Sequence, residues 1–103
     1  MVNLIVLYPQ PIDEALFNIN YEKHIALLHD KTGLPLDSKP YTVTRFISTP
    51  EKESFFYLMF SMPFASQEAL DASLATPEMQ EVSADATRIS SGGMPVILVG
   101  KPE

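Results

Sequence analysis

Cysteine is absent from the 103 residues of this sequence. Its absence excludes a disulfide framework, a thiolate metal site, an iron–sulfur cluster and a cysteine nucleophile. Basic residues are also scarce: seven Lys and Arg are set against 13 Asp and Glu, which gives a net charge of −6 at pH 7. That balance argues against nucleic acid as a partner, because phosphate backbones are held by clusters of positive charge.

Long hydrophobic runs are missing as well. The longest, residues 4–8 and 55–60, fall far short of the roughly 20 residues that a membrane-spanning helix needs. No polybasic stretch favours an anionic membrane surface, and the first residues lack the basic and cleavage regions of a signal peptide. We therefore expect a single domain over residues 1–103, located in the cytoplasm and without a membrane partner.

Motifs for cofactors and metals are not found either. No glycine loop for phosphate and no dinucleotide fingerprint is present, because Gly92-Gly93 lacks both the flanking strand and the spacing. The two histidines, His24 and His29, are five residues apart, whereas metal ligands on one helix face are three or four apart. We expect neither a cofactor nor a metal site.

The first third of the chain predicts a strand followed by a helix. Residues 2–8 are short, apolar and β-branched, and Pro9 ends them. Asp13 is a suitable N-cap for a helix that runs to Lys31, and Gly33 suits the left-handed position after its end. A helical spacing of four, three and four places one stripe on the buried side of this helix: Phe17, Tyr21, His24 and Leu28.

The remainder predicts two strands, a second helical region and a last strand. Residues 41–49 alternate, with Tyr41, Val43, Arg45 and Ile47 on one face and Thr42, Thr44 and Phe46 on the other. A charged turn over 50–54 leads into a partner strand at 55–62, which Pro63 is expected to end. Ser66 caps a second helix that Thr76-Pro77 restarts or continues, and Gly92-Gly93 precedes a strand at 94–99.

This order, β-α-β-β-α-β, predicts an α+β, ferredoxin-like fold with an antiparallel sheet. Two helices cover one face of such a sheet and leave the other uncovered. The predicted strands are apolar on both faces, unlike those of a half-solvated antiparallel sheet. We therefore expect a homodimer that pairs two sheet faces.

Several stretches resemble the EthD family of the dimeric α+β barrel superfamily. They are the opening at residues 4–9, the helix text Tyr21-Glu-Lys-His24, the Glu-Ala-Leu and Thr-Pro-Glu of residues 68–78, and Gly92-Gly93. Ala26 stands where the family signature usually has proline. The resemblance implies a homodimer with a hydrophobic pocket between helices and sheet in each subunit. It also implies aromatic, lactone or polyketide-like ligands, from aromatic degradation or natural-product biosynthesis.

His24 is the leading candidate for chemistry, because a partly buried imidazole can transfer a proton near neutral pH. Tyr21, one turn earlier, is the predicted orienting partner. Arg45, the one charge within its strand, or Tyr8 would anchor an oxyanion. The alternatives are a core histidine bonded to the backbone and an arginine that forms a salt bridge between subunits.

Aromatic residues supply the predicted substrate wall, and the residues assigned to it are Tyr8, Phe46, Tyr57, Phe60 and Phe64. The same set also suits a plain core and dimer interface. His29 lies one step off the stripe beside Asp30 and Lys31, which favours a solvated histidine at the helix end.

Two functions remain open from the residues. The first is a cofactor-independent enzyme that uses His24 for isomerisation, cyclisation or oxygenation of a small hydrophobic molecule. The second is a non-catalytic accessory protein that holds a pathway intermediate, such as a pigment or antibiotic precursor. A third alternative is a purely structural dimer with a filled core, and the sequence does not decide whether the protein is an enzyme.

Overall fold

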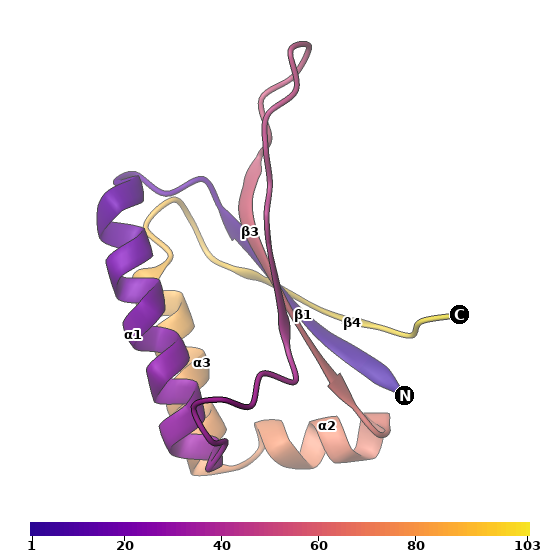
Figure 1. Ribbon diagram of the computed structural model, residues 1–103. Coiled ribbons are helices and arrows are strands. Elements are labelled where there is room, and N and C mark those ends of the chain that lie inside the picture. The colour runs from indigo at the N-terminus through magenta and orange to yellow at the C-terminus, as the bar shows by residue number, and fades with distance from the viewer.

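The computed structural model describes residues 1–103, and its sheet has four antiparallel strands in the order β2-β3-β1-β4 (Figure 1). The elements in chain order are β1 (Val2–Pro9), α1 (Glu14–Thr32), β2 (Thr42–Arg45), β3 (Phe56–Phe64), α2 (Gln67–Leu74), α3 (Pro77–Ile89) and β4 (Val96–Gly100). The predicted ferredoxin-like α+β fold is confirmed, with the second helical region divided into α2 and α3.

The helices begin and end where local chemistry favours it. Asp13 caps α1 by accepting from the backbone N–H of Leu16, and Gly33 follows the helix with a φ of 74°. Thr76 caps α3 in the same way, and Pro77 occupies its first turn, where the missing N–H costs nothing. None of the helices is long and apolar enough to cross a lipid bilayer.

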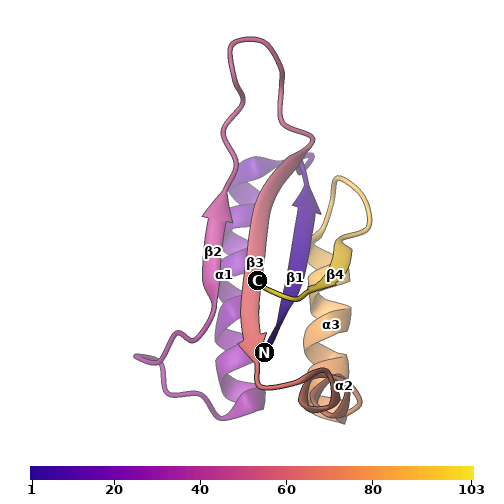
Figure 2. The same cartoon turned by 90° about the vertical axis from the view of Figure 1, so that its right-hand side faces the viewer.

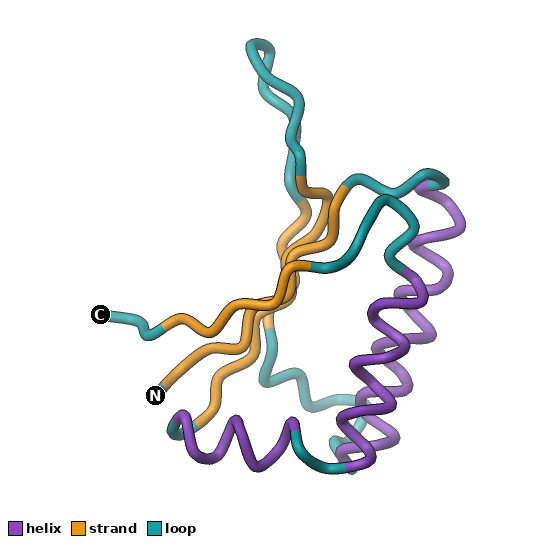
Figure 3. Tube along the Cα trace, turned by 180° about the vertical axis from the view of Figure 1, so that it is seen from behind, coloured by secondary structure: helices purple, strands orange, loops and turns teal.

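All three helices lie on one side of the sheet (Figures 2 and 3). α1 and α3 run beside each other, and α2 lies across the end of the sheet nearest the N-terminus (Figure 1). The predicted stripe of α1 is buried against the sheet, with Phe17 and Leu28 both 2% exposed. Phe17 packs edge-on against Tyr8 of β1, with ring centroids 5.4 Å apart.

The opposite face of the sheet has no covering element. Leu4 and Val6 of β1 point toward the helices, where they line a cavity. Because side chains alternate along a strand, Ile5 and Leu7 point the other way. Leu98 pairs with Ile5 and Met59 pairs with Leu7, so all four gather on this open face. Leu98 is 47% exposed there. We call these four residues the open-face patch.

The two strands after the first helix differ from their predicted lengths. β2 ends at Arg45 instead of residue 49, and residues 46–55 project beyond the sheet as a long arm (Figure 1). Ile47 and Phe55 are largely exposed in this arm. The backbone N–H of Phe46 still donates to the carbonyl oxygen of Tyr57 at 3.0 Å, but regular strand pairing stops at Arg45. β3 continues through Pro63. Its pairing with β2 ends at Ser61, so β1 is the only strand beside Pro63, and a proline is tolerated where one side of the strand is unpaired.

The prediction of a solvated His29 is wrong. His29 is 4% exposed, and its Nδ1 donates to the carbonyl oxygen of Pro35 at 3.0 Å. Its Nε2 accepts from the Tyr41 hydroxyl at 2.7 Å. The loop after α1 folds back over the helix end and buries the ring, an event that helical spacing alone does not report. His29 therefore joins the loop to α1.

Candidate functional site

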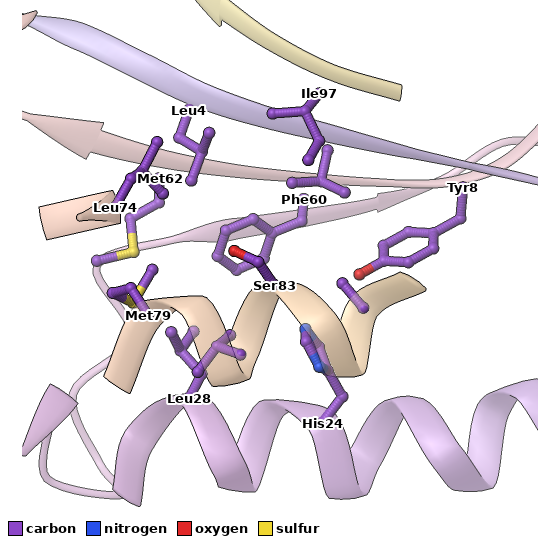
Figure 4. Close-up of a pocket in the computed structure, with 13 residues that line it drawn as sticks. Leu4, Tyr8, His24, Leu28, Phe60, Met62, Leu74, Met79, Ser83 and Ile97 are labelled. Carbon is purple, nitrogen blue, oxygen red and sulfur yellow. The ribbon is translucent and has the colours of Figure 1, made fainter. Parts of the chain in front are cut away.

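A cavity of about 170 Å³ lies between the helices and the sheet (Figure 4). Of the 13 residues that line it, 11 are hydrophobic. Leu4, Val6 and Phe60 form the sheet side, and Leu28, Met79 and Val82 belong to the helix side. The helical layer therefore does not fill its interface with the sheet, and the space left is predominantly apolar.

His24 enters this cavity from the buried stripe of α1. Its Nδ1 donates to Oδ2 of Asp85 on α3 at 2.9 Å, and the two side chains are 8% and 16% exposed. No protein group bonds the other ring nitrogen, Nε2, and the ring points from α1 toward the cavity (Figure 4). A carboxylate on Nδ1 holds the ring in the tautomer that leaves a lone pair on Nε2.

Asp85 is held in turn by Arg88, one turn further along α3. The guanidinium donates to Oδ1 of Asp85 through Nε at 2.9 Å and Nη2 at 2.7 Å. Burial alone would raise the pKa of Asp85, but hydrogen bonds and charge from His24 and Arg88 together hold that pKa below its ordinary value. Asp85 is therefore an anion at neutral pH.

The environment favours a neutral His24. Burial lowers the pKa of His24 below its ordinary value of 6.5, and the nearby charge of Arg88 lowers it further. The hydrogen bond and charge of Asp85 oppose this shift without cancelling it. At pH 7 the ring is thus an unprotonated base, as proton abstraction requires.

Two hydroxyls share the cavity with His24. The Tyr8 side chain lies at the same end, with its oxygen directed toward His24, and Ser83 projects from α3 (Figure 4). Burial raises the pKa of Tyr8, and the charge of Asp85 raises it further, so the phenol stays protonated. Tyr8 is therefore available as a hydrogen-bond donor beside the histidine.

The charge balance around Asp85 leads to a prediction for Arg88→Gln. Removing the guanidinium leaves the Asp85 charge uncompensated, so the pKa of His24 should rise toward or above 6.5. NMR titration of the His24 ring measures this shift directly. Lys52→Gln, which removes one positive charge at the arm, is the control and should leave the midpoint unchanged. An unchanged midpoint in Arg88→Gln would contradict the assigned role of Arg88.

Among the residues predicted for the site, Tyr8, His24 and Phe60 line the cavity. Tyr21 does not line it, and its hydroxyl is buried without a hydrogen-bond partner. Its ring packs beside that of His24 at 5.9 Å between centroids. The expectation that Tyr21 orients His24 is corrected here, because the imidazole donates its Nδ1 hydrogen bond to Asp85.

Arg45 and Tyr57 lie in a separate cluster, away from the cavity lining. Arg45 donates to Oδ1 of Asn18 at 2.8 Å, and the Tyr57 hydroxyl donates to Oε1 of Glu14 at 2.9 Å. Here β2 and β3 meet the N-terminal half of α1, and the side chains satisfy one another. Arg45 is therefore not positioned to anchor an oxyanion beside His24. Phe46 and Phe64, which were predicted for the substrate wall, do not line the cavity either.

Sequence reasoning missed Asp85 and Ser83. Ser83 follows Val82 and Asp85 precedes Ala86, and Val82 and Ala86 belong to the buried stripe of α3. In the sequence, Asp85 resembles one half of an ordinary surface ion pair with Arg88. The available signal was an acid beside that stripe on a helix expected to pack near His24. Asp85 and His24 are 61 residues apart, so no local pattern joins them.

No protein-family model matches the sequence, and no curated protein matches it. The structure is similar to that of an EthD family protein from Bacillus halodurans, with 33% identity and a TM-score of 0.84, over 100% of this chain and 99% of that one. It also resembles a dimeric ferredoxin-like protein of unknown function from Jannaschia sp. (15% identity, TM-score 0.70, 99% and 100% covered). A third similar structure is the hydroxynitrile lyase of Passiflora edulis, with 11% identity and a TM-score of 0.67, over 95% of this chain and 90% of that one.

Proposed function

Because the chain belongs to the EthD family, we propose that it is a cofactor-independent enzyme that acts on a small hydrophobic molecule by proton transfer. His24 is the base, Asp85 positions it, and Tyr8 donates a hydrogen bond to the substrate oxygen. The substrate class is the aromatic, lactone or polyketide-like intermediates of catabolic or natural-product pathways.

One observation carries this proposal: a neutral imidazole, fixed by a carboxylate on Nδ1, presents Nε2 to an apolar cavity. An apolar surrounding strengthens the electrostatic interactions that stabilise a developing charge. A histidine that only filled the core would need neither the open nitrogen nor the space in front of it.

The proposed step is abstraction of a proton from a carbon next to a carbonyl group. The proton moves to Nε2 of His24, and the electron pair of the C–H bond forms a C=C bond as the carbonyl oxygen becomes an enolate. Tyr8 donates to that oxygen, and Asp85 stabilises the imidazolium. Where the substrate carries a conjugated C=C bond, return of the proton from His24 to the far carbon of the extended enolate shifts the double bond and gives isomerisation. Attack of the enolate carbon on a second carbonyl carbon of the same molecule, whose oxygen takes up the proton from His24, gives cyclisation.

The comparison with the Passiflora lyase supports the proposal only at the level of the fold. That protein is an enzyme, so this architecture houses catalysis in at least one other chain. The residues that carry the proposal for the present chain are its own His24, Asp85 and Tyr8.

A non-catalytic carrier is the second candidate, and the apolar lining of the cavity favours it. Burial of a ligand against 11 hydrophobic residues provides affinity without any proton transfer. In that case His24 would only donate or accept a hydrogen bond. The two candidates differ in whether a C–H proton of a bound carbonyl compound exchanges with solvent.

Deuterium exchange tests the proposal. The protein is incubated in D2O with cyclohexanone, γ-butyrolactone and acetophenone, and mass spectrometry follows deuterium uptake beside the carbonyl. We expect faster uptake than in buffer for at least one compound, with the rate falling as pH drops below 6.5 and His24 becomes protonated. Binding without accelerated uptake across this panel would support the carrier.

We further infer that the chain forms a homodimer through the open-face patch. The apolar side chains Ile5, Leu7, Met59 and Leu98 stand on a sheet face that no helix covers. An identical face on a second copy would bury them with closed twofold symmetry. The similar protein from Jannaschia is described as dimeric.

A further inference from the structure

The size of the cavity limits what it can hold. Its volume is about 170 Å³, and an engineered apolar protein cavity of about 150 Å³ binds benzene. The space therefore accommodates one ring with a small substituent. Two fused rings would require side chains such as Leu74 or Met62 to move away from their positions in the lining.

The charges around the cavity further restrict which ligands it can bind. No lysine or arginine lines the walls, and the carboxylate of Asp85 is hydrogen-bonded to His24, which does line them. Arg88 contacts that carboxylate from the exposed side of α3, with 60% of its side chain exposed. A bound anion would therefore lose its hydration without gaining a cationic partner, which is costly in an apolar site.

The polar groups that do face the space suit a neutral oxygen. They are Nε2 of His24 and the hydroxyls of Tyr8 and Ser83, with the first two at one end (Figure 4). A phenol hydroxyl donates well to a carbonyl oxygen, and Leu4, Phe60 and Val82 supply contact for a hydrocarbon ring. One polar end and one apolar body describe the complementary molecule.

We propose that the cavity selects neutral molecules of a single ring that carry one carbonyl oxygen, and that it rejects carboxylates and fused-ring compounds. This inference rests on the proposed function, since it places the carbonyl at Tyr8 and the neighbouring C–H group at His24. It narrows the ligand class by excluding polyketide-like molecules of two or more fused rings.

The five methionines provide the readout for a binding test. Met62 and Met79 line the cavity, whereas Met1, Met59 and Met94 do not and serve as internal controls. Protein with ¹³C-methyl methionine is titrated at pH 8 with three probes. They are cyclohexanone, cyclohexanecarboxylate, which has the same ring with a negative charge, and 1-tetralone, which adds a fused ring.

We expect cyclohexanone to shift the Met62 and Met79 signals in a saturable way, with the other three unchanged. The carboxylate and the tetralone should bind at least about tenfold more weakly. Ala86→Leu, which fills the cavity, should abolish cyclohexanone binding, and Leu74→Ala, which enlarges it, should improve binding of tetralone. Comparable affinity for all three probes, or no response at Met62 and Met79, would overturn the inference.

The outcome separates this inference from the proposed function. If cyclohexanone binds selectively but no carbonyl compound exchanges deuterium, the ligand class stands and catalysis fails. If 1-tetralone is added to the exchange panel and exchanges faster than cyclohexanone, catalysis stands and the ligand class fails.

Discussion

His24→Gln should slow deuterium exchange of the best carbonyl compound by about 10²- to 10⁴-fold, the usual contribution of a general base. Glutamine retains a hydrogen-bonding group of similar reach, so it can contact Asp85 and the ligand. It has no lone pair basic enough to accept a proton from carbon. Binding of cyclohexanone, measured on the Met62 and Met79 methyl groups, should therefore survive while exchange is lost.

His29→Gln is the matched control, because it makes the same substitution on the same helix. His29 is bonded to Tyr41 and to loop carbonyls and does not line the cavity. We expect this variant to lose some thermal stability and to keep its exchange rate. Equal losses of exchange in the two variants, or undiminished exchange in His24→Gln, would remove His24 from the base role.

The second large effect is expected on assembly. Leu98→Asp places a short charged side chain on the open-face patch of each subunit, and dimerisation would bury both copies without a partner. The dimer should weaken by more than about 100-fold and become a monomer at micromolar concentration. Sedimentation velocity measures this directly, and far-ultraviolet circular dichroism checks that the fold is kept.

Val43→Asp is the control for assembly. Val43 is 41% exposed against 47% for Leu98, and it also lies on an edge strand. It pairs with Phe60, which lines the cavity, so Val43 belongs to the helix-covered side of the sheet. This variant should remain dimeric. A dimeric Leu98→Asp, or a monomeric Val43→Asp, would place the interface elsewhere.

Local patterns in the sequence were sufficient for most of the fold. The caps at Asp13 and Thr76 and the left-handed Gly33 act within one turn, so the helix limits follow from neighbouring residues. The stripe of α1 was predicted residue by residue, and it is buried. The lengths of β2 and β3 were not, because they depend on which strand lies alongside at each position.

The site could be predicted only in part from the sequence, for the same physical reason. His24 was predicted from its place on the buried stripe of α1, and Tyr8 and Phe60 were predicted as aromatic residues of the substrate wall; all three line the cavity. Asp85, which is hydrogen-bonded to His24, lies on a different helix, and Arg45 is hydrogen-bonded to Asn18 and does not line the cavity. Which side chains meet across α1, α3 and the sheet depends on how the layers are packed, which spacing along one element does not encode.

Proton abstraction by His24 requires a neutral ring, and ¹⁵N NMR of the imidazole between pH 4.5 and pH 8 tests its protonation state most directly. The chain has only two histidines, so the His24→Gln variant assigns the signals. We expect a neutral ring at pH 7 with its proton on Nδ1, bonded to Asp85, and a titration midpoint below 6.5. A proton on Nε2, or a midpoint above 6.5, would show that the cavity does not face a neutral base.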